Sequence, residues 1–324
     1  MPDPKIDIKE SPIPASPVQP VQYSGEQEIQ FRCHKDIECF NACCKQIDLQ
    51  LTPYDIVRLK NRLGIKSDEF LKQYTYPYEV DKDGVPGVKM KPVEGTNQCQ
   101  FMTDEGCSVY EDRPASCRYY PAGLMSLRRQ DENFDRQSYV IVQESHCKGH
   151  FEDQVQTIDE YRQDQGVVEY DENSRGWRQL MLKKISSGPI LGKPTAESLQ
   201  FLFMACYNHD KFREFVNTAS FEKTFDLSDE VKQQLNTDDV ALMHFGIDLM
   251  KQVLFGEHSI PLRDGAVEQR IEERKEVVEQ RNKLKEEIAK AQKDNYELDA
   301  EREKAEKAGA DPLGCTDGEC NSEG

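Results

Sequence analysis

Cysteine clustering constrains this chain more than any other feature of its sequence. Eleven cysteines occur in 324 residues, and eight of them lie between Cys33 and Cys147. Four fall within twelve residues, as Cys33, Cys39, Cys43 and Cys44, among Arg, His, Lys and Asp side chains. Cysteine is common in apolar cores, but these polar surroundings do not suit inert buried thiols. The block therefore predicts a metal site.

The adjacent cysteines at the end of this block, Cys43 and Cys44, indicate more than one metal ion. If Cys39 and Cys43 lie on a helix, they are one turn apart on the same face and can share a metal. Cys44 would then project about 100° away from Cys43. The two neighbours could thus serve two centres, or one large cluster.

The other four cysteines of this region are more widely spaced. Cys99, Cys107 and Cys117 lie beside turn signals, and Cys147 follows a segment rich in Val and Ile. We expect the first three to lie on loops, where the backbone can bend sulfurs toward one point. The predicted metal ligands are then Cys33, Cys39, Cys43, Cys44, Cys99, Cys107, Cys117 and Cys147.

The donor type limits the metal to a few candidates. Thiolate is the usual ligand of zinc, and of iron in iron–sulfur clusters. Eight thiols match two four-coordinate sites, or one four-cysteine cluster with spare thiols. The spacing matches neither the paired knuckles of zinc fingers nor the C-x3-C-x2-C run of radical S-adenosylmethionine enzymes. The predicted cofactor is an iron–sulfur cluster, such as a 4Fe–4S cluster, or zinc.

Several neighbours of the cysteines could support such a site. His34, His146 and His150 could replace a thiolate, or could be exposed or supporting residues. The residues around Cys117 are Arg113, Arg118, Tyr119 and Tyr120. The two arginines could lower the pKa of nearby thiols through their positive charge, or they could have a packing or salt-bridge role instead.

The remaining cysteines carry weaker signals. Cys206 lies in an apolar segment and reads as a structural core residue. Cys315 and Cys320 near the chain's end could form a mobile dithiol or a metal-delivery arm, or an inert tail.

Charge and compartment limit the partners. The net charge is -18 and the pI about 4.9, so phosphate backbones and anionic lipid surfaces should repel the chain. We therefore expect no nucleic-acid partner. We also expect no membrane partner, since no window approaches the roughly 20 apolar residues of a membrane span. The N-terminus has no basic and apolar signal-peptide regions. The expected location is cytoplasmic, where thiols stay reduced.

Composition along the chain indicates an α+β fold with an irregular cysteine-rich metal-binding module, a short hairpin, a mainly helical half and a long charged C-terminal helix. The predicted segments are a disordered proline-rich leader (1–27), the cysteine module (28–152), a helical region packed on it (153–264), the charged helix (265–309) and a flexible tail (310–324).

Local signals place elements within these segments. Thr52 and Pro53 mark a helix start, and Ser67 should open a second helix in the same way. Turn signals between Thr75 and Thr103 predict a hairpin, and the apolar run at 139–142 predicts a strand. Apolar residues over 199–206 and 241–254 predict a buried helix and an amphipathic one, the latter capped by Asp238 or Asp239.

The charged segment reads as a solvated helix. Opposite charges recur four residues apart, as at Glu279 with Lys283 and Glu286 with Lys290. A heptad repeat allows coiled-coil pairing, so a protein partner could bind there; a lone charged helix is the alternative. The repeat consists of Val277, Leu284, Ala291 and Leu298.

Three stretches resemble a bacterial cysteine-cluster family described as zinc- or iron-chelating. They are Phe31-Arg32-Cys33 through Cys43-Cys44 with Leu51-Thr52-Pro53-Tyr54-Asp55, Gly106-Cys107 through Cys117-Arg118-Tyr119-Tyr120-Pro121, and the surroundings of Phe203-Met204-Ala205-Cys206-Tyr207. The resemblance covers roughly residues 28–262. It implies a metal site on the first eight cysteines, holding an iron–sulfur cluster or zinc.

Three functions remain open at this level, and the sequence does not decide whether the protein is an enzyme. The first is a metal-cluster protein in redox or metal-handling work. The second is a zinc-stabilised protein-interaction module. The third is a methylase-like enzyme acting on protein lysines, because the flagellin lysine N-methylases share a similar cysteine module. No Gly-rich nucleotide loop accompanies that likeness.

Overall fold

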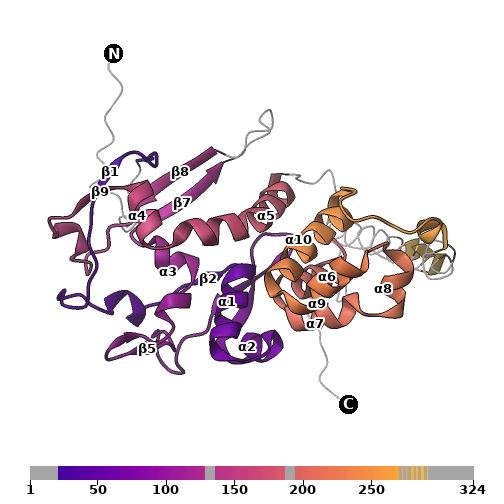
Figure 1. Ribbon diagram of the computed structural model, residues 1–324, viewed down its shortest axis with the longest axis horizontal. Coiled ribbons are helices and arrows are strands. Elements are labelled where there is room, and N and C mark those ends of the chain that lie inside the picture. The colour runs from indigo at the N-terminus through magenta and orange to yellow at the C-terminus, as the bar shows by residue number, and fades with distance from the viewer. Residues whose placement is uncertain are drawn as a thin grey trace, which may run out of the picture. The chain divides into compact units, whose positions relative to one another are not determined.

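The computed structural model describes residues 21–127, 136–186 and 194–269, with some positions between 272 and 290. By its contacts the chain divides into two compact units, Met1–Pro261 and Leu262–Gly324. The first unit mixes helices with small antiparallel sheets, which confirms the predicted α+β class (Figure 1).

The sheets lie in the cysteine-bearing part of the first unit. Their strands are β1 (Glu28–Gln30) with β9 (Val155–Thr157), β2 (Gln50–Leu51) with β4 (Pro86–Met90) and β3 (Thr75–Glu79), β5 (Met102–Thr103) with β6 (Gly106–Cys107), and β7 (Ala122–Leu127) with β8 (Arg136–Ile141). The β3–β4 pair confirms the hairpin, and β8 confirms the strand ahead of Cys147.

Helices make up most of the rest. They are α1 (Pro53–Leu63), α2 (Ser67–Tyr74), α3 (Ala115–Tyr119), α4 (Ile158–Asp164), α5 (Val167–Ser186), α6 (Ala196–Tyr207), α7 (His209–Val216), α8 (Ala219–Thr224), α9 (Asp229–Thr237) and α10 (Asp239–Phe255). Short 3-10 helices are η2 (Ala42–Lys45), η3 (Tyr110–Asp112) and η4 (Gly149–Phe151).

Capping residues start the helices largely as the sequence predicts. The Thr52 side chain accepts a hydrogen bond from Asp55 N, and Pro53 occupies the first helical position of α1. Asp238 caps α10 by accepting from two backbone amides. The predicted second helix does begin at Ser67, but Ser67 does not cap it. Lys66 is the N-cap residue of α2, and the Ser67 hydroxyl accepts from the amide of Asp210.

Helices α6 and α10 form the apolar centre of the helical half, where Figure 1 draws them next to each other. Leu202, Ala205, Leu242 and Ile247 are all buried. The backbones approach closely, since a Cβ atom added at Gly246 would lie 2.4 Å from the Ala205 carbonyl oxygen. Both predicted apolar helices are thus confirmed, and they pack on each other.

A buried cation ties the helical half to the cysteine-bearing half. Lys60 of α1 is 5 % exposed. Its Nζ lies 2.8 Å from an Asp239 oxygen of α10 and 3.7 Å from Asp210 of α7. A buried charge needs such partners to offset its lost hydration. α5 adds to this connection by packing against α1, α3, α4 and α10.

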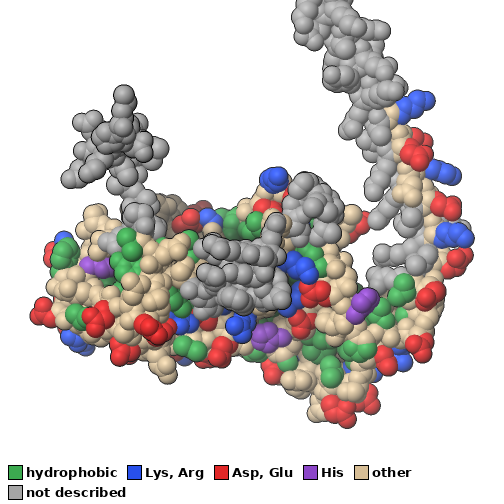
Figure 2. Space-filling view, turned by 90° about the horizontal axis from the view of Figure 1, so that it is seen from above, with side chains coloured by type: hydrophobic (Ala, Val, Ile, Leu, Met, Phe, Trp, Pro, Cys, Tyr) green, Lys and Arg blue, Asp and Glu red, His purple; other side chains and the backbone are tan. Residues whose placement is uncertain are grey.

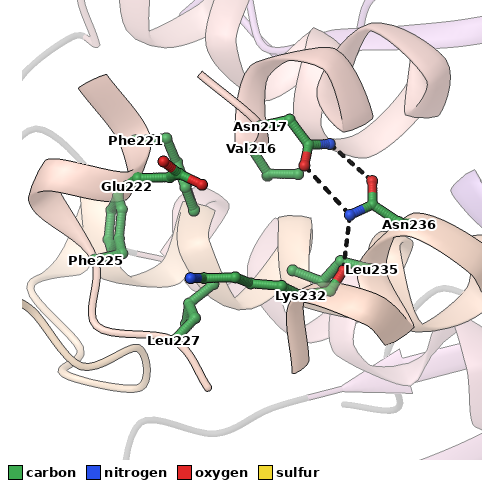
Figure 3. Close-up of a pocket in the computed structure, with 9 residues that line it drawn as sticks. All are labelled: Val216, Asn217, Phe221, Glu222, Phe225, Leu227, Lys232, Leu235 and Asn236. Atoms are coloured by element: carbon green, nitrogen blue, oxygen red, sulfur yellow. Dashed lines mark hydrogen bonds between the residues drawn. The ribbon is translucent and has the colours of Figure 1, made fainter. Parts of the chain in front are cut away.

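A small cavity lies among α7, α8 and α9 (Figure 3). Phe221 and Phe225 line one side, and Asn217 and Asn236 face each other through paired hydrogen bonds of 2.8 and 3.2 Å. Its volume of about 10 Å³ is room for one water molecule. This cavity is therefore too small for an organic substrate.

Parts of the predicted segments fall outside the described residues. These include residues 1–20 of the leader, the heptad positions of the charged helix, and the tail with Cys315 and Cys320. At the end of the leader, Tyr23 pairs with Tyr139 through backbone hydrogen bonds of 2.7 and 2.9 Å. In the charged segment, Lys275 lies 3.7 Å from Glu272.

The molecular surface carries both charge signs. Acidic and basic side chains are interspersed on the face that Figure 2 shows. Among the described residues, no helix combines the length and the apolar character required to cross a bilayer.

Candidate metal centre

The fold brings the two cysteine groups together through the backbone. The amide of Cys99 donates to the carbonyl of Cys44 at 2.8 Å. Nearby, the Asn41 side chain donates to the Thr103 carbonyl at 2.9 Å. Residues more than 50 positions apart in the sequence are therefore fixed as neighbours.

The Cys147 end of the module joins the first group separately. The amide of Arg32 donates to the Gly149 carbonyl at 3.1 Å. The amide of Lys148 donates to the Cys39 sulfur at 3.2 Å. Cys33 and Cys39 are thus held against the segment that carries Cys147.

Local structure at the first group differs from the helix considered above. Cys43 and Cys44 lie on η2, a 3-10 helix, and Cys39 lies in the turn before it. Asn41 adopts φ 63, a left-handed conformation that Asn tolerates better than most residues. This turn prevents a continuous α-helix from Cys39 to Cys43, so the one-turn spacing does not apply.

The second group is also more regular than expected. Cys107 lies on strand β6, and Cys117 lies in helix α3, so the expectation of loops is wrong for both. Cys99 forms an isolated bridge with Pro92. Of these three residues, Cys99 is linked directly to η2, through the hydrogen bond from its amide to the Cys44 carbonyl.

Asp55 fixes the position of α3 and hence of Cys117. Its side chain is fully buried and accepts hydrogen bonds from Thr52 N (2.7 Å), Thr52 Oγ1 (2.9 Å) and Ala115 N (2.7 Å). Burial raises the pKa of Asp55 to about 6, against the opposing effect of these donors. The sequence analysis missed this role, although the Thr52-x-x-Asp55 capping pattern was visible.

The two arginines near Cys117 have different roles: one packs against its neighbours, and the other also lowers the pKa of a nearby thiol. Arg118 donates to the carbonyls of Arg113 and Gln165 at 3.1 and 2.8 Å, and its guanidinium stacks over Tyr170. This is a packing role. The buried Arg113 has an electrostatic one as well, because its positive charge lowers the pKa of Cys107 against the raising effect of burial.

The tyrosines near Cys117 direct their hydroxyl groups to residues other than Cys117. Tyr119 donates to Asp171 through its hydroxyl. Tyr120 places its buried hydroxyl beside Cys147 and Glu144, and burial is the largest cause that raises its pKa.

Exposure is unequal among the eight thiols. Cys99 and Cys147 are buried, whereas Cys33 and Cys43 are exposed. The other four are half-buried: Cys39, Cys44, Cys107 and Cys117. The nine cysteines that the structure describes are all unbridged thiols.

Burial and mutual repulsion both raise the pKa of thiols in this region. Desolvation raises the pKa of Cys33 to about 11, and nearby charges on Cys43, Cys39 and Cys147 add to the rise. Burial also raises the pKa of Cys117, with contributions from Cys99 and Cys107. Thiols that repel one another as thiolates gain stability when a cation lies between them.

The vicinal pair behaves as a unit. The sulfurs of Cys43 and Cys44 lie 4.0 Å apart. The hydrogen bond between them lowers the pKa of Cys43 to about 7 and raises that of Cys44. Because either sulfur can donate in this hydrogen bond, the pair as a whole loses its first proton readily to give a metal-binding thiolate.

The three histidines have other partners. His34 Nε2 lies 3.2 Å from Glu152, and His146 Nε2 lies 3.6 Å from Glu144. The ring of His150 bonds the Val142 carbonyl at 3.1 Å. These contacts match the supporting role that the sequence left open.

Cys206 lies apart from this group. It is fully buried in α6, and burial alone raises its pKa to about 12. It matches the structural role predicted for it.

The donor set fits a metal in its chemistry but is not closed around one. In the part of the chain that the structure describes, no three Cys, His, Asp or Glu side chains form a group that could hold a metal ion as they stand. The hydrogen bonds above join the segments that carry the cysteines, and each cysteine side chain has a single χ1 torsion with staggered alternatives. Binding would require sulfur rotation within an existing backbone frame.

Comparison with known proteins agrees with this geometry. Residues 32–148 match the family model CxxCxxCC, which is described as a putative zinc- or iron-chelating domain. Neither the curated proteins nor the solved structures provide a match to the chain. The matched span contains all eight clustered cysteines. The segment from residue 32 to residue 148 is thus similar to the zinc- or iron-chelating domain that the CxxCxxCC model describes.

Proposed function

We propose that this domain binds an iron–sulfur cluster and that the protein acts in redox chemistry or metal handling. The observation that carries the proposal is the hydrogen bond from Cys99 N to Cys44 O, which joins the two cysteine-bearing segments. Sulfur-rich donor sets are what iron–sulfur clusters use. The neighbouring imidazoles are engaged with other partners.

The spacing of the vicinal sulfurs supports a shared or adjacent metal. Two thiolates bound to one tetrahedral metal at about 2.3 Å are separated by about 3.8 Å. The Cys43 and Cys44 sulfurs lie 4.0 Å apart. Little movement is therefore needed for both to reach one metal or two adjacent ones.

Exposure of two sulfurs supports a role in exchange with other molecules. Cys33 and Cys43 are exposed. Electron or metal transfer requires a partner to come close to the centre, which a fully enclosed structural site would prevent. We also place the protein in the cytoplasm, where such thiols stay reduced.

Zinc is the second candidate. A structural zinc stabilises the elements that carry its ligands, and α3, which carries Cys117, connects the cysteine module to the rest of the unit. Ala115 of α3 is bonded to Asp55 of α1, and α3 packs on α5. A structural zinc at Cys117 would stabilise these contacts and present the helical half to a protein partner.

Anaerobic purification distinguishes these candidates. An iron–sulfur protein should be brown, should absorb at about 400 nm, and should contain iron and acid-labile sulfide in stoichiometric amounts. Cys117→Ala should lower the metal content, whereas the matched change Cys206→Ala should leave it unchanged. A colourless protein with stoichiometric zinc would replace the first candidate by the second. Freshly isolated protein with neither metal would contradict both.

A further inference from the structure

We propose that the eight thiols form two unequal metal centres, one shielded and one open. The inference rests on the metal binding proposed above and assigns each sulfur to a centre. The shielded centre consists of Cys44, Cys99, Cys107 and Cys117. The open centre consists of Cys33, Cys39, Cys43 and Cys147.

Backbone contacts group the shielded set. Cys99 donates to the Cys44 carbonyl at 2.8 Å, and its own carbonyl accepts from Met102 at 3.1 Å. Met102 pairs with Cys107 in the β5–β6 hairpin. Cys117 is assigned to the same set because its helix α3 packs against β2, in the segment that follows Cys44. After burial, Cys99 and Cys107 contribute most to the rise of its pKa.

None of the shielded sulfurs is on an exposed residue. Cys99 is buried and the other three are half-buried. Gly106, next to Cys107, lies against the Phe40 ring, where an added Cβ would be 3.2 Å from a ring carbon. The Phe40 ring, from the first cysteine block, therefore covers the backbone next to Cys107.

A different group of contacts defines the open set. Lys148 N donates to the Cys39 sulfur at 3.2 Å, which places Cys39 beside Cys147. Arg32 N donates to the Gly149 carbonyl at 3.1 Å, which places Cys33 beside the same turn. Two of this set, Cys33 and Cys43, are exposed. The open set thus reaches solvent through these two residues, while Cys39 is half-buried and Cys147 is buried.

The boundary between the two sets passes through η2. Successive residues of a 3-10 helix point about 120° apart, because each turn has 3.0 residues. Cys43 and Cys44 therefore project in different directions, and their sulfurs are still only 4.0 Å apart. Cys43 influences the pKa of Cys33 and of Cys117 alike, so it is the point at which the two centres meet.

Unequal shielding has a chemical consequence. Thiol reagents and chelators reach exposed sulfurs first, so metal in the open centre should exchange while metal in the shielded centre stays bound. The shielded centre would hold the module together. The open one would accept or donate metal or electrons.

Timed alkylation tests this division on the full-length, metal-loaded protein. N-ethylmaleimide is added with a chelator under anaerobic conditions, each cysteine is followed by peptide mass spectrometry, and bound metal is measured in parallel. Cys33 and Cys43 of the open set should be modified at least about tenfold faster than the shielded set, with loss of only part of the metal. Cys206 is the internal reference for a buried thiol without metal.

Matched variants test the same division by metal content. Cys33→Ser should remove only the rapidly lost metal, and Cys117→Ser only the slowly lost metal. Modification of all eight thiols in one phase would overturn the two-centre proposal, as would loss of all metal from both variants. Those outcomes leave metal binding intact, whereas metal-free wild-type protein would overturn both proposals. Alkylation of the wild type gives the answer even if Cys117→Ser does not fold.

Discussion

At the scale of single residues, the centre depends on buried polar groups that position the cysteines. Asp55 is the main example, because one carboxylate completes the cap of α1 and also holds the first residue of α3, Ala115. A second capping box has the same chemistry at the surface, where Glu160 accepts from Thr157 N at 2.8 Å and Thr157 Oγ1 at 3.0 Å. The two capping carboxylates differ in burial, since Asp55 is buried and Glu160 is exposed.

Replacing Asp55 by alanine should therefore be costly. Three donors would lose their acceptor in a buried site, so we expect the free energy of unfolding to fall by about 3 kcal/mol. Urea denaturation followed by circular dichroism measures this change. Glu160→Ala is the matched control and should have a clearly smaller effect, because water can solvate the freed donors. Equal effects for the two variants would show that Asp55 is only a cap.

His209 is a second buried residue with a measurable consequence. It is 0 % exposed, and neither ring nitrogen completes a hydrogen bond. Burial, aided by the charge of Lys60, lowers its pKa from 6.5 to about 4, and this value includes the opposing effects of Asp239 and Asp210. The folded chain therefore keeps this ring neutral near pH 5, while the unfolded chain protonates it.

Stability should consequently fall as the pH is lowered from 6.5 towards 4. The contribution of His209 is fully present above pH 6.5, and its loss over this window is about 3 kcal/mol at most. Denaturation curves at several pH values should show a shallower pH dependence for His209→Leu than for the wild type. Parallel curves for the two proteins would contradict the assignment, because all other titrating groups are common to both.

At the scale of elements, short and irregular pieces serve the site, whereas long helices serve the core. η2 directs two adjacent sulfurs apart, and its 3-10 geometry depends on the turn at Asn41. α6 and α10 instead need close contact along their length. Gly246 allows this contact, and Gly176 of α5 lies in a looser place, where an added Cβ would be 3.4 Å from Ile247.

These two helical glycines should respond oppositely to alanine. Gly246→Ala should destabilise the protein by about 2 kcal/mol, because the new methyl group meets the backbone carbonyl of Ala205. Gly176→Ala should instead stabilise it by up to about 1 kcal/mol through helix propensity. Thermal unfolding of both variants measures the difference. A gain of stability in both would mean that α6 and α10 pack less tightly than described.

At the scale of the whole molecule, the cysteine module and the helical half belong to one compact unit, Met1–Pro261. α5 connects them, since it packs against α3 beside Cys117 and against α10 in the helical core. The single tryptophan of the chain, Trp177, lies on α5. Its fluorescence can therefore report on changes that begin at the metal centre.

Removal of metal should destabilise this unit as a whole. We expect the midpoint of denaturation to fall by the equivalent of about 3 kcal/mol or more, since metal binding contributes directly to folding free energy. Trp177 fluorescence and circular dichroism, recorded with and without chelator under reducing conditions, should shift together. A Trp177 transition that does not move on metal removal would show that the helical half folds independently of the centre.

The sequence alone determined the chemistry and many of the local elements. Thiols among polar residues indicated a metal site because few other roles suit them, and Thr52, Pro53 and Asp238 mark helix starts through contacts within a few residues. The CxxCxxCC match over residues 32–148 agrees with that inference. Such features need only neighbours in the chain, and so they can be read from it.

Tertiary structure alone decided which sulfurs face each other and which face water. The links from Cys99 to Cys44 and from Lys148 to Cys39 join residues far apart in the sequence, and no local pattern encodes such a pairing. The same holds for Asp55, whose second partner lies 60 positions away on α3. Spacing gives the number of donors, but burial and long-range hydrogen bonds set how they are arranged.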